Sequence, residues 1–285
     1  MAALVELLIM LMAGAAPFLL GTLLADVSGY PPLPVVWGLG LVGVLALILS
    51  AFFSRECFAP GCGRVPAWGF LAPRRFGALA YISLGVAGVC GIVLQFACGA
   101  GDFTVPLGAL GVLAGYFFFA PPLAWRGRGV GEAVGALSFG LLPVLTGYYL
   151  QTGHLITEIL VYGLALTLAG FNLFLVWGLP RPGQESDLAA GTMALRLGPA
   201  PAALVYTLVN ILTIAGLVFI LVFPAAALPS SPGLIALMLL AVVNQELVKR
   251  RAYLRQDLQD WLVYLTAALH LGMCLVFALG LWWRR

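Results

Sequence analysis

Nine runs of about 20 apolar residues, separated by polar segments, constrain this chain more than any other feature. Such a run is long enough for an α-helix to cross about 30 Å of hydrocarbon. The runs are too long and too uniformly apolar for the alternating strands of a membrane barrel. We therefore predict an all-α polytopic membrane protein whose nine transmembrane helices span about 3–24, 33–54, 77–99, 103–123, 130–150, 155–178, 200–223, 232–248 and 261–283.

The composition supports a membrane location. Hydrophobic residues make up 62% of the chain and charged residues only 9%, and the mean hydropathy is +1.07. A soluble domain needs a charged surface that this chain does not supply. The sequence therefore predicts an integral membrane protein, and we expect it in a bacterial inner (cytoplasmic) membrane.

The positions of the basic residues predict the orientation. All fourteen lysines and arginines except Arg284 and Arg285 fall in the segments after the second, fourth, sixth and eighth runs. Cytoplasmic loops carry such an excess of basic residues, so the N-terminus is predicted in the cytoplasm. Two of these cytoplasmic loops, 55–76 and 179–199, are long. The net charge of +3 is then a sign of topology and predicts no nucleic-acid partner.

Three segments resemble a known family. The long segment "GYFFFAPPLAWRGRGVGEAVGALSFGLLPVLTGYYLQTG" (115–153) resembles the middle of the UbiA superfamily of membrane prenyltransferases. "ESDLAAGTMALRLG" (185–198) is similar to the second acidic motif of that superfamily, and "AGAAPFLLGTLLA" (13–25) to its first helix. The resemblance is closest to the branch that prenylates 1,4-dihydroxy-2-naphthoate. It implies a single UbiA-like transmembrane domain over residues 1–285.

The resemblance also implies a reaction. In this family, two acidic motifs hold Mg²⁺ ions that bind a polyprenyl diphosphate. The ions neutralise the leaving diphosphate, and an aromatic ring attacks the resulting allylic cation. Oxygen ligands and a hard divalent ion suit phosphate, and neutralising a leaving group is worth several kcal/mol.

The first acidic motif is missing from this sequence. It should fall on "LSAFFSREC" (49–57), where Ser50, Ala51 and Ser54 stand in place of an asparagine and two aspartates. Glu56 is the only acid nearby, and it is offset. The hydroxyls of Ser50 and Ser54 remain as candidate substrate-binding groups.

The second acidic motif is partly kept. Gly183 stands in place of its first aspartate, whereas Asp187 fills the second position and Glu185 lies between them. Asp187 is thus the only one of the four expected aspartates that the sequence retains. Glu185 and Asp187 are the candidate catalytic and metal-binding residues, able at most to hold one Mg²⁺ with water completing its coordination.

Four further residues are candidates for substrate binding. Arg126 and Arg128 match a basic segment that the family places near the diphosphate, and a guanidinium fits phosphate oxygens; the alternative is that they only anchor the loop in the cytoplasm. Glu132 forms a salt bridge with this loop or holds the aromatic substrate. Arg196 is an anchor or a partner for Asp187.

Two functions remain open. One is a catalytically degenerate homologue that binds a prenyl lipid or an isoprenoid quinone, without Mg²⁺, and serves as a binding or assembly subunit beside other membrane subunits. The other is an active Mg²⁺-dependent prenyltransferase that transfers a polyprenyl group to an aromatic acceptor, as in menaquinone or ubiquinone synthesis. The missing aspartates favour the first, and the 115–153 segment with Glu185 and Asp187 supports the second.

The predicted orientation can be tested with single cysteines. In a background in which the five native cysteines are replaced by alanine, we expect an impermeant thiol reagent added from outside to label Ser230→Cys but not Ser186→Cys. The predicted spans place these two positions on opposite sides of the membrane. Labelling of Ser186→Cys alone would show that the predicted orientation is inverted.

Overall fold

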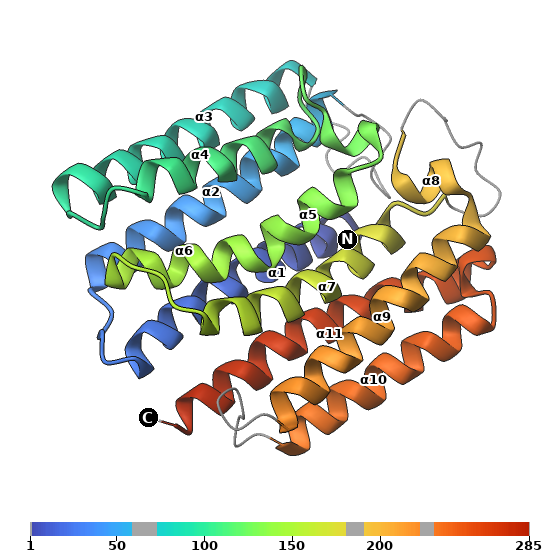
Figure 1. Cartoon of the computed structure of the whole chain (residues 1–285). Helices are drawn as coiled ribbons and strands as arrows, with labels where there is room; N and C mark the ends of the chain where they lie inside the picture. Colours follow the sequence, from blue (N-terminus) through green and yellow to red (C-terminus); the bar gives the residue numbers. More distant parts are fainter. Residues whose placement is uncertain (1, 59–72, 181–190, 223–230, 285) are drawn as a thin grey trace. The chain divides into compact units, whose positions relative to one another are not determined.

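The fold is built of helices alone within the residues that the structure describes. The computed structural model describes residues 2–58, 73–180, 191–222 and 231–284. It contains no β-strand in these four ranges (Figure 1). By contacts, the chain divides into two compact units, one of Met1–Trp125 with Leu142–Leu155 and one of Arg126–Leu141 with Ile156–Arg285. We refer to them as the N-terminal unit and the C-terminal unit.

The N-terminal unit contains five α-helices and two short irregular helical segments. In chain order they are α1 (Ala2–Val27), α2 (Pro34–Phe58), α3 (Pro73–Ile92), the π-helical turn η1 (Val93–Ala97), α4 (Thr104–Ala114), the 3₁₀ turn η2 (Tyr116–Phe118) and α6 (Leu141–Thr152).

The C-terminal unit contains six α-helices and shorter turns. They are the 3₁₀ turn η3 (Trp125–Arg128), α5 (Gly131–Phe139), α7 (Glu158–Trp177), α8 (Met193–Leu197), α9 (Pro199–Val222), α10 (Ser231–Lys249), the 3₁₀ turn η5 (Ala252–Leu254) and α11 (Gln256–Trp282). Within this unit α7 packs against α5, α9 and α11, and α10 packs against α9 and α11.

The structure confirms the all-α membrane fold. Eight helical stretches within the described residues are long and apolar enough to cross a membrane: Leu4–Val27, Pro34–Phe58, Arg74–Ala97, Gly131–Thr152, Glu158–Trp177, Pro199–Val222, Ser231–Lys249 and Gln256–Trp282. The outer faces also fit a lipid environment, since α9 exposes large apolar side chains such as Leu204 and Ile211. The chain is therefore an integral membrane protein.

The count of nine spans is not reproduced. The predicted 103–123 span is a shorter apolar helix, Thr104–Phe118. The regular α-helix ends at Ala114, and the chain tightens into η2 before the consecutive prolines Pro121 and Pro122. A proline has no backbone N–H to continue the helical hydrogen bonds. The number of spans and the cytoplasmic N-terminus stay predictions, as does the single domain over residues 1–285.

In the N-terminal unit, α1 and α6 are in contact through their backbones at two glycines. A Cβ atom on Gly21 of α1 would overlap the carbonyl oxygen of Val144 and lie 2.8 Å from its carbonyl carbon. A Cβ on Gly147 of α6 would likewise overlap the carbonyl oxygen of Phe18. Lipid tails are as apolar as the helix side chains, so the hydrophobic effect does not drive membrane helices together. The helices associate instead through such close packing at small residues.

The predicted span 130–150 is interrupted in the middle. α5 ends at Phe139 and α6 begins at Leu141, with Gly140 between them. A Cβ on Gly140 would overlap the Thr167 hydroxyl of α7, so this position requires glycine. The Leu141 backbone N–H donates instead to Thr167 Oγ1 at 3.0 Å. A side chain thus satisfies a backbone group that water cannot reach in hydrocarbon.

The glycine contact between α1 and α6 generates a stability prediction. We expect Gly21→Ala to reduce the free energy of unfolding by about 1–3 kcal/mol, the usual cost of forcing an extra carbon into a packed interface. Gly88→Ala in α3 is the matched control, because a Cβ there meets nothing within 4 Å. Thermal unfolding in detergent measures both. Equal melting temperatures for the two variants would contradict the close contact.

Candidate functional site

The end of α2 is the position where the sequence predicted the first acidic motif. Ser50 and Ser54 are fully buried there. Ser50 Oγ donates to the Ala80 carbonyl of α3 at 2.9 Å. Ser54 Oγ donates to the Ala51 carbonyl at 2.8 Å and lies 3.3 Å from that of Tyr116 in η2. Both hydroxyl protons are therefore engaged with backbone carbonyls inside the N-terminal unit.

Arg55, in the last turn of α2, is paired with two acidic side chains. Its Nη2 lies 2.8 Å from Glu56 Oε1 and its Nη1 lies 3.3 Å from Glu6 Oε2 of α1. The guanidinium carbon also lies 4.7 Å from the centre of the Phe52 ring, within the range of a cation–π contact. The three charged side chains are 10–14% exposed. Glu56, the nearby acid, is therefore already paired with an internal cation.

In the C-terminal unit, the loop that holds Arg126 and Arg128 packs against the segment that leads into α8. Gly191 adopts φ +59°, and a Cβ there would overlap the Gly127 carbonyl oxygen. The Arg196 side chain joins the same two segments, because Nε donates to the Gly191 carbonyl at 2.9 Å and Nη2 donates to the Gly127 carbonyl at 2.8 Å. This contact places Arg196 beside the Arg126–Arg128 loop.

Glu132, in the first turn of α5, lies beside the segment that leads into α8 and is 3% exposed. Its Oε1 accepts a hydrogen bond from the Ala194 backbone N–H of α8 at 3.3 Å, and its charge interacts with that of Arg126. Its Oε2 is buried without a hydrogen-bond partner among the described residues. Burying a carboxylate is costly, and the hydrogen bond from Ala194 and the charge of Arg126 offset only part of that cost.

The N-terminal cap of α8 completes this arrangement. Thr192 Oγ1 accepts from the Leu195 N–H at 3.2 Å and donates to the Gly178 carbonyl, at the end of α7, at 3.0 Å. Such a cap satisfies a backbone N–H that has no partner within the helix. This cap fixes the start of α8 to the end of α7. The hydrogen bond to Glu132 fixes α8 to the start of α5. We refer to Arg126, Arg128, Glu132, Thr192 and Arg196 as the α5–α8 cluster.

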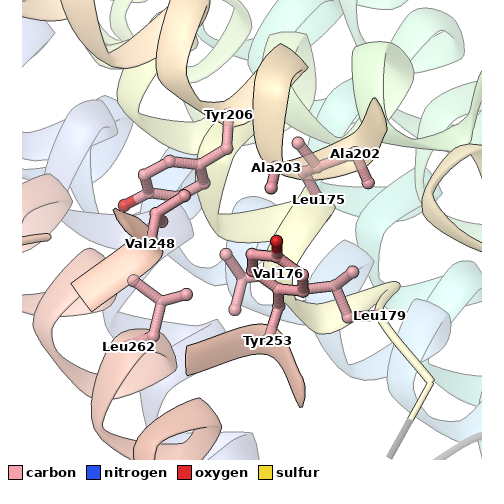
Figure 2. Close-up of a pocket in the computed structure, with 9 residues that line it drawn as sticks. All are labelled: Leu175, Val176, Leu179, Ala202, Ala203, Tyr206, Val248, Tyr253 and Leu262. Atoms are coloured by element: carbon pink, nitrogen blue, oxygen red, sulfur yellow. The ribbon is translucent and has the colours of Figure 1, made fainter. Parts of the chain in front are cut away.

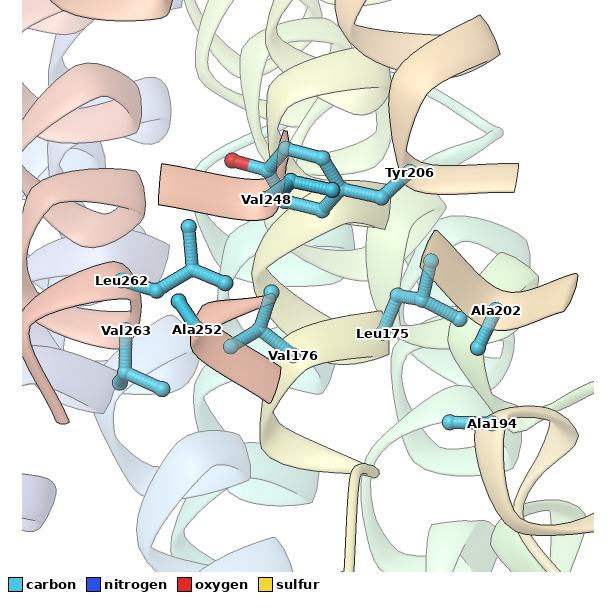
Figure 3. Packing of buried hydrophobic residues seen from close by; sticks show 9 residues of the cluster. All are labelled: Leu175, Val176, Ala194, Ala202, Tyr206, Val248, Ala252, Leu262 and Val263. Atoms are coloured by element: carbon cyan, nitrogen blue, oxygen red, sulfur yellow. The ribbon is translucent and has the colours of Figure 1, made fainter. Parts of the chain in front are cut away.

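A small apolar pocket lies elsewhere in the C-terminal unit, between the ends of α7 and α10 and the starts of α9 and α11 (Figure 2). Its cavity volume is about 10 Å³, barely the space of one water molecule, and Tyr206 and Tyr253 are among its lining residues. Beside it, buried residues of α7, α8, α9, α10, η5 and α11 form a continuous apolar cluster (Figure 3). Ala194 brings α8 into that cluster, so the α5–α8 cluster is anchored on the core.

The structure therefore brings four of the eight predicted site residues together: Arg126, Arg128, Glu132 and Arg196. Ser50 and Ser54 belong to the N-terminal unit. Glu185 and Asp187 lie outside the described residues, so their roles stay predictions. Sequence reasoning missed the ion pairs of Arg55. The adjacent Arg55–Glu56 pair was a visible signal for one of them, whereas the pairing with Glu6 depends on the packing of α1 against α2.

The described residues do not form a metal site. No three Asp, Glu, His or Cys side chains in the four described ranges gather in a way that could hold a metal ion. At the end of α2, Glu56 is paired with Arg55, and the two serines donate to carbonyls. The groups present there do not suit Mg²⁺, which requires anionic or carbonyl oxygens free to coordinate it.

Comparisons with known proteins identify the fold. Neither a family model nor a curated protein sequence matches the chain. Solved structures of UbiA homologues do. The apo structure of a UbiA homologue from Aeropyrum pernix K1 superposes with a TM-score of 0.65 at 14% identity, over 94% of this chain and 96% of that one.

Two further solved structures agree. A UbiA homologue from Archaeoglobus fulgidus bound to GPP and Mg²⁺ matches with a TM-score of 0.61 at 14% identity, over 95% of this chain and 99% of that one. The structure of a digeranylgeranylglyceryl phosphate synthase in membranes matches with a TM-score of 0.61 at 11% identity, over 99% of both chains. The chain thus has the fold of the UbiA homologues. The predicted resemblance is confirmed for the fold, and the dihydroxynaphthoate branch stays a prediction.

The contact between Gly127 and Gly191 can be tested by local hydrogen exchange. We expect Gly191→Ala to reduce the protection of the Ala194 and Leu195 amides, because the added Cβ displaces the segment whose N–H groups bond to Glu132 and Thr192. Gly198→Ala is the matched control. Gly198 also has a positive φ, +84°, but a Cβ there meets nothing within 4 Å. Equal loss of protection in the two variants would assign the effect to backbone strain alone.

Proposed function

We propose that this chain is a catalytically degenerate member of the UbiA superfamily that binds a prenyl lipid or an isoprenoid quinone. It acts in a bacterial inner membrane as a binding or assembly subunit, with other membrane subunits as partners. The fold supports the lipid part of the proposal, because a structure with the same fold holds GPP with Mg²⁺. The charges at the end of α2 support the loss of catalysis.

The observation that carries the proposal is the cation at Arg55. Arg55 follows Ala51 by four residues, so both lie on the same face of α2, where the family resemblance places the first acidic motif. A metal ion there would have to compete with the guanidinium for Glu56. Breaking a buried ion pair in this way costs about 3–5 kcal/mol, because it leaves one charge uncompensated.

The α5–α8 cluster supports a role in binding. Arg126 and Arg128 bring two guanidinium groups to one loop, and such groups suit the oxygens of a phosphate or diphosphate. The loop is held by Arg196 and by the contact of Gly127 with Gly191. Anion binding by this cluster does not depend on metal ions at the end of α2. A protein can therefore keep the capacity to bind a polar lipid head after it has lost catalysis.

An activity assay combined with lipid analysis tests the proposal. We expect purified protein with Mg²⁺ and GPP or a longer prenyl diphosphate to transfer no prenyl group to dihydroxynaphthoate or hydroxybenzoate. An active UbiA-type enzyme assayed in parallel controls for the substrates. Because the proposal keeps the lipid site, we expect mass spectrometry of the gently solubilised protein to detect a bound prenyl lipid or quinone.

The alternative function makes the opposite prediction. Mg²⁺-dependent transfer by the native protein that Asp187→Ala abolishes would show that Glu185 and Asp187 form a working metal site. The proposal of a degenerate homologue would then be wrong. Absence of transfer together with absence of any bound isoprenoid would support the loss of catalysis but refute the lipid-binding role.

A further inference from the structure

The turn between α10 and α11 holds four basic residues within seven positions: Lys249, Arg250, Arg251 and Arg255. All four are exposed. The turn joins two candidate membrane spans, Ser231–Lys249 and Gln256–Trp282, so it lies where the chain leaves the hydrocarbon. Basic residues at that level attract anionic lipid headgroups, each contributing about 1 kcal/mol.

The four basic residues divide into two pairs with different surroundings. Arg250 Nε lies 3.1 Å from Glu246 Oε1, and Arg255 Nη2 lies 3.1 Å from Asp257 Oδ2. In the part of the chain that the structure describes, Lys249 and Arg251 have no ion pair and no side-chain hydrogen bond. Their charges are therefore the pair that can attract an anion.

The backbone at Arg251 is a second, independent observation. Arg251 adopts φ +57° and ψ +39°, the left-handed conformation that glycine tolerates and an arginine adopts at a cost. Glycine is the usual residue where a helix ends in this conformation. A strained backbone position occupied by a charged side chain indicates that the side chain has a use of its own.

The apolar pocket adjoins this turn. Val248, just before Lys249, and Tyr253, two residues after Arg251, both line it, together with Leu179, Ala203 and Leu262 (Figure 2). Its cavity of about 10 Å³ has barely the space of one water molecule, so a lipid bound at this turn keeps its acyl chains outside the pocket. Trp261 of α11, 62% exposed, adds an aromatic group of the kind found at membrane interfaces.

We propose that the α10–α11 turn is a binding site for one anionic phospholipid. Lys249 and Arg251 hold its phosphate, for which the arginine supplies a planar fork of donors. All of these residues belong to the C-terminal unit. The site is separate from the α5–α8 cluster and does not depend on the function proposed above.

Native mass spectrometry of the delipidated full chain in detergent tests this site. We titrate phosphatidylglycerol and phosphatidylcholine with identical acyl chains and compare their apparent Kd values for the first bound lipid. We expect tighter binding of phosphatidylglycerol. The double variant K249Q/R251Q should weaken that binding on the order of 10- to 30-fold, since it removes two cations that face the phosphate.

A second double variant distinguishes the site from general charge attraction. R250Q/R255Q removes the same number of charges from residues already paired with acids, and we expect less than a threefold change. Equal binding of the two lipids, or equal losses in the two double variants, would each overturn the proposal.

Discussion

Backbone contact between helices at glycines is the interaction on which this structure depends. In hydrocarbon, helices gain nothing by hiding apolar side chains, so they associate where their backbones approach closely. Gly21 and Gly147 allow this between α1 and α6, and Gly140 allows it between α5 and the Thr167 side of α7. A close backbone contact at glycine also holds the polar region of the C-terminal unit, where Gly191 lies against Gly127. Arg196 joins the two sides of this last contact, because it donates to the carbonyls of both glycines.

Two arginines illustrate how the surroundings of a charged side chain decide which groups it binds. Arg55 is buried between the carboxylates of Glu6 and Glu56, so its charge is matched and the acids are unavailable to a metal ion. Arg196 is exposed and donates to the Gly127 and Gly191 carbonyls, so it fixes a loop rather than neutralising an acid. The first arrangement engages the acids near the end of α2, whereas the second keeps Arg126 and Arg128 in a defined place. Together they are consistent with a protein that binds without catalysing.

Much of the fold could be predicted from the sequence, because a membrane span needs only length and apolarity. Six of the eight candidate spans are single α-helices, and the runs at 33–54 and 200–223 match α2 and α9 closely. The predictions were weaker where a helix breaks inside an apolar run. The interruption at Gly140 depends on Thr167 of another helix, and the shortness of α4 on how η2 folds toward the consecutive prolines. Neither is encoded in hydropathy.

The sequence by itself determined that this chain crosses a membrane, that its first acidic motif is missing, and that it resembles the UbiA superfamily. Those conclusions rest on residue type and spacing, which any conformation of the chain retains. Only the tertiary structure decided that the hydroxyls of Ser50 and Ser54 donate to backbone carbonyls and that Arg55 pairs with both Glu6 and Glu56. It also decided that Glu132 accepts a hydrogen bond from α8. These facts depend on distances of about 3 Å, several of them between residues far apart in the chain, because a hydrogen bond forms only at such separations and an ion pair weakens as its charges move apart.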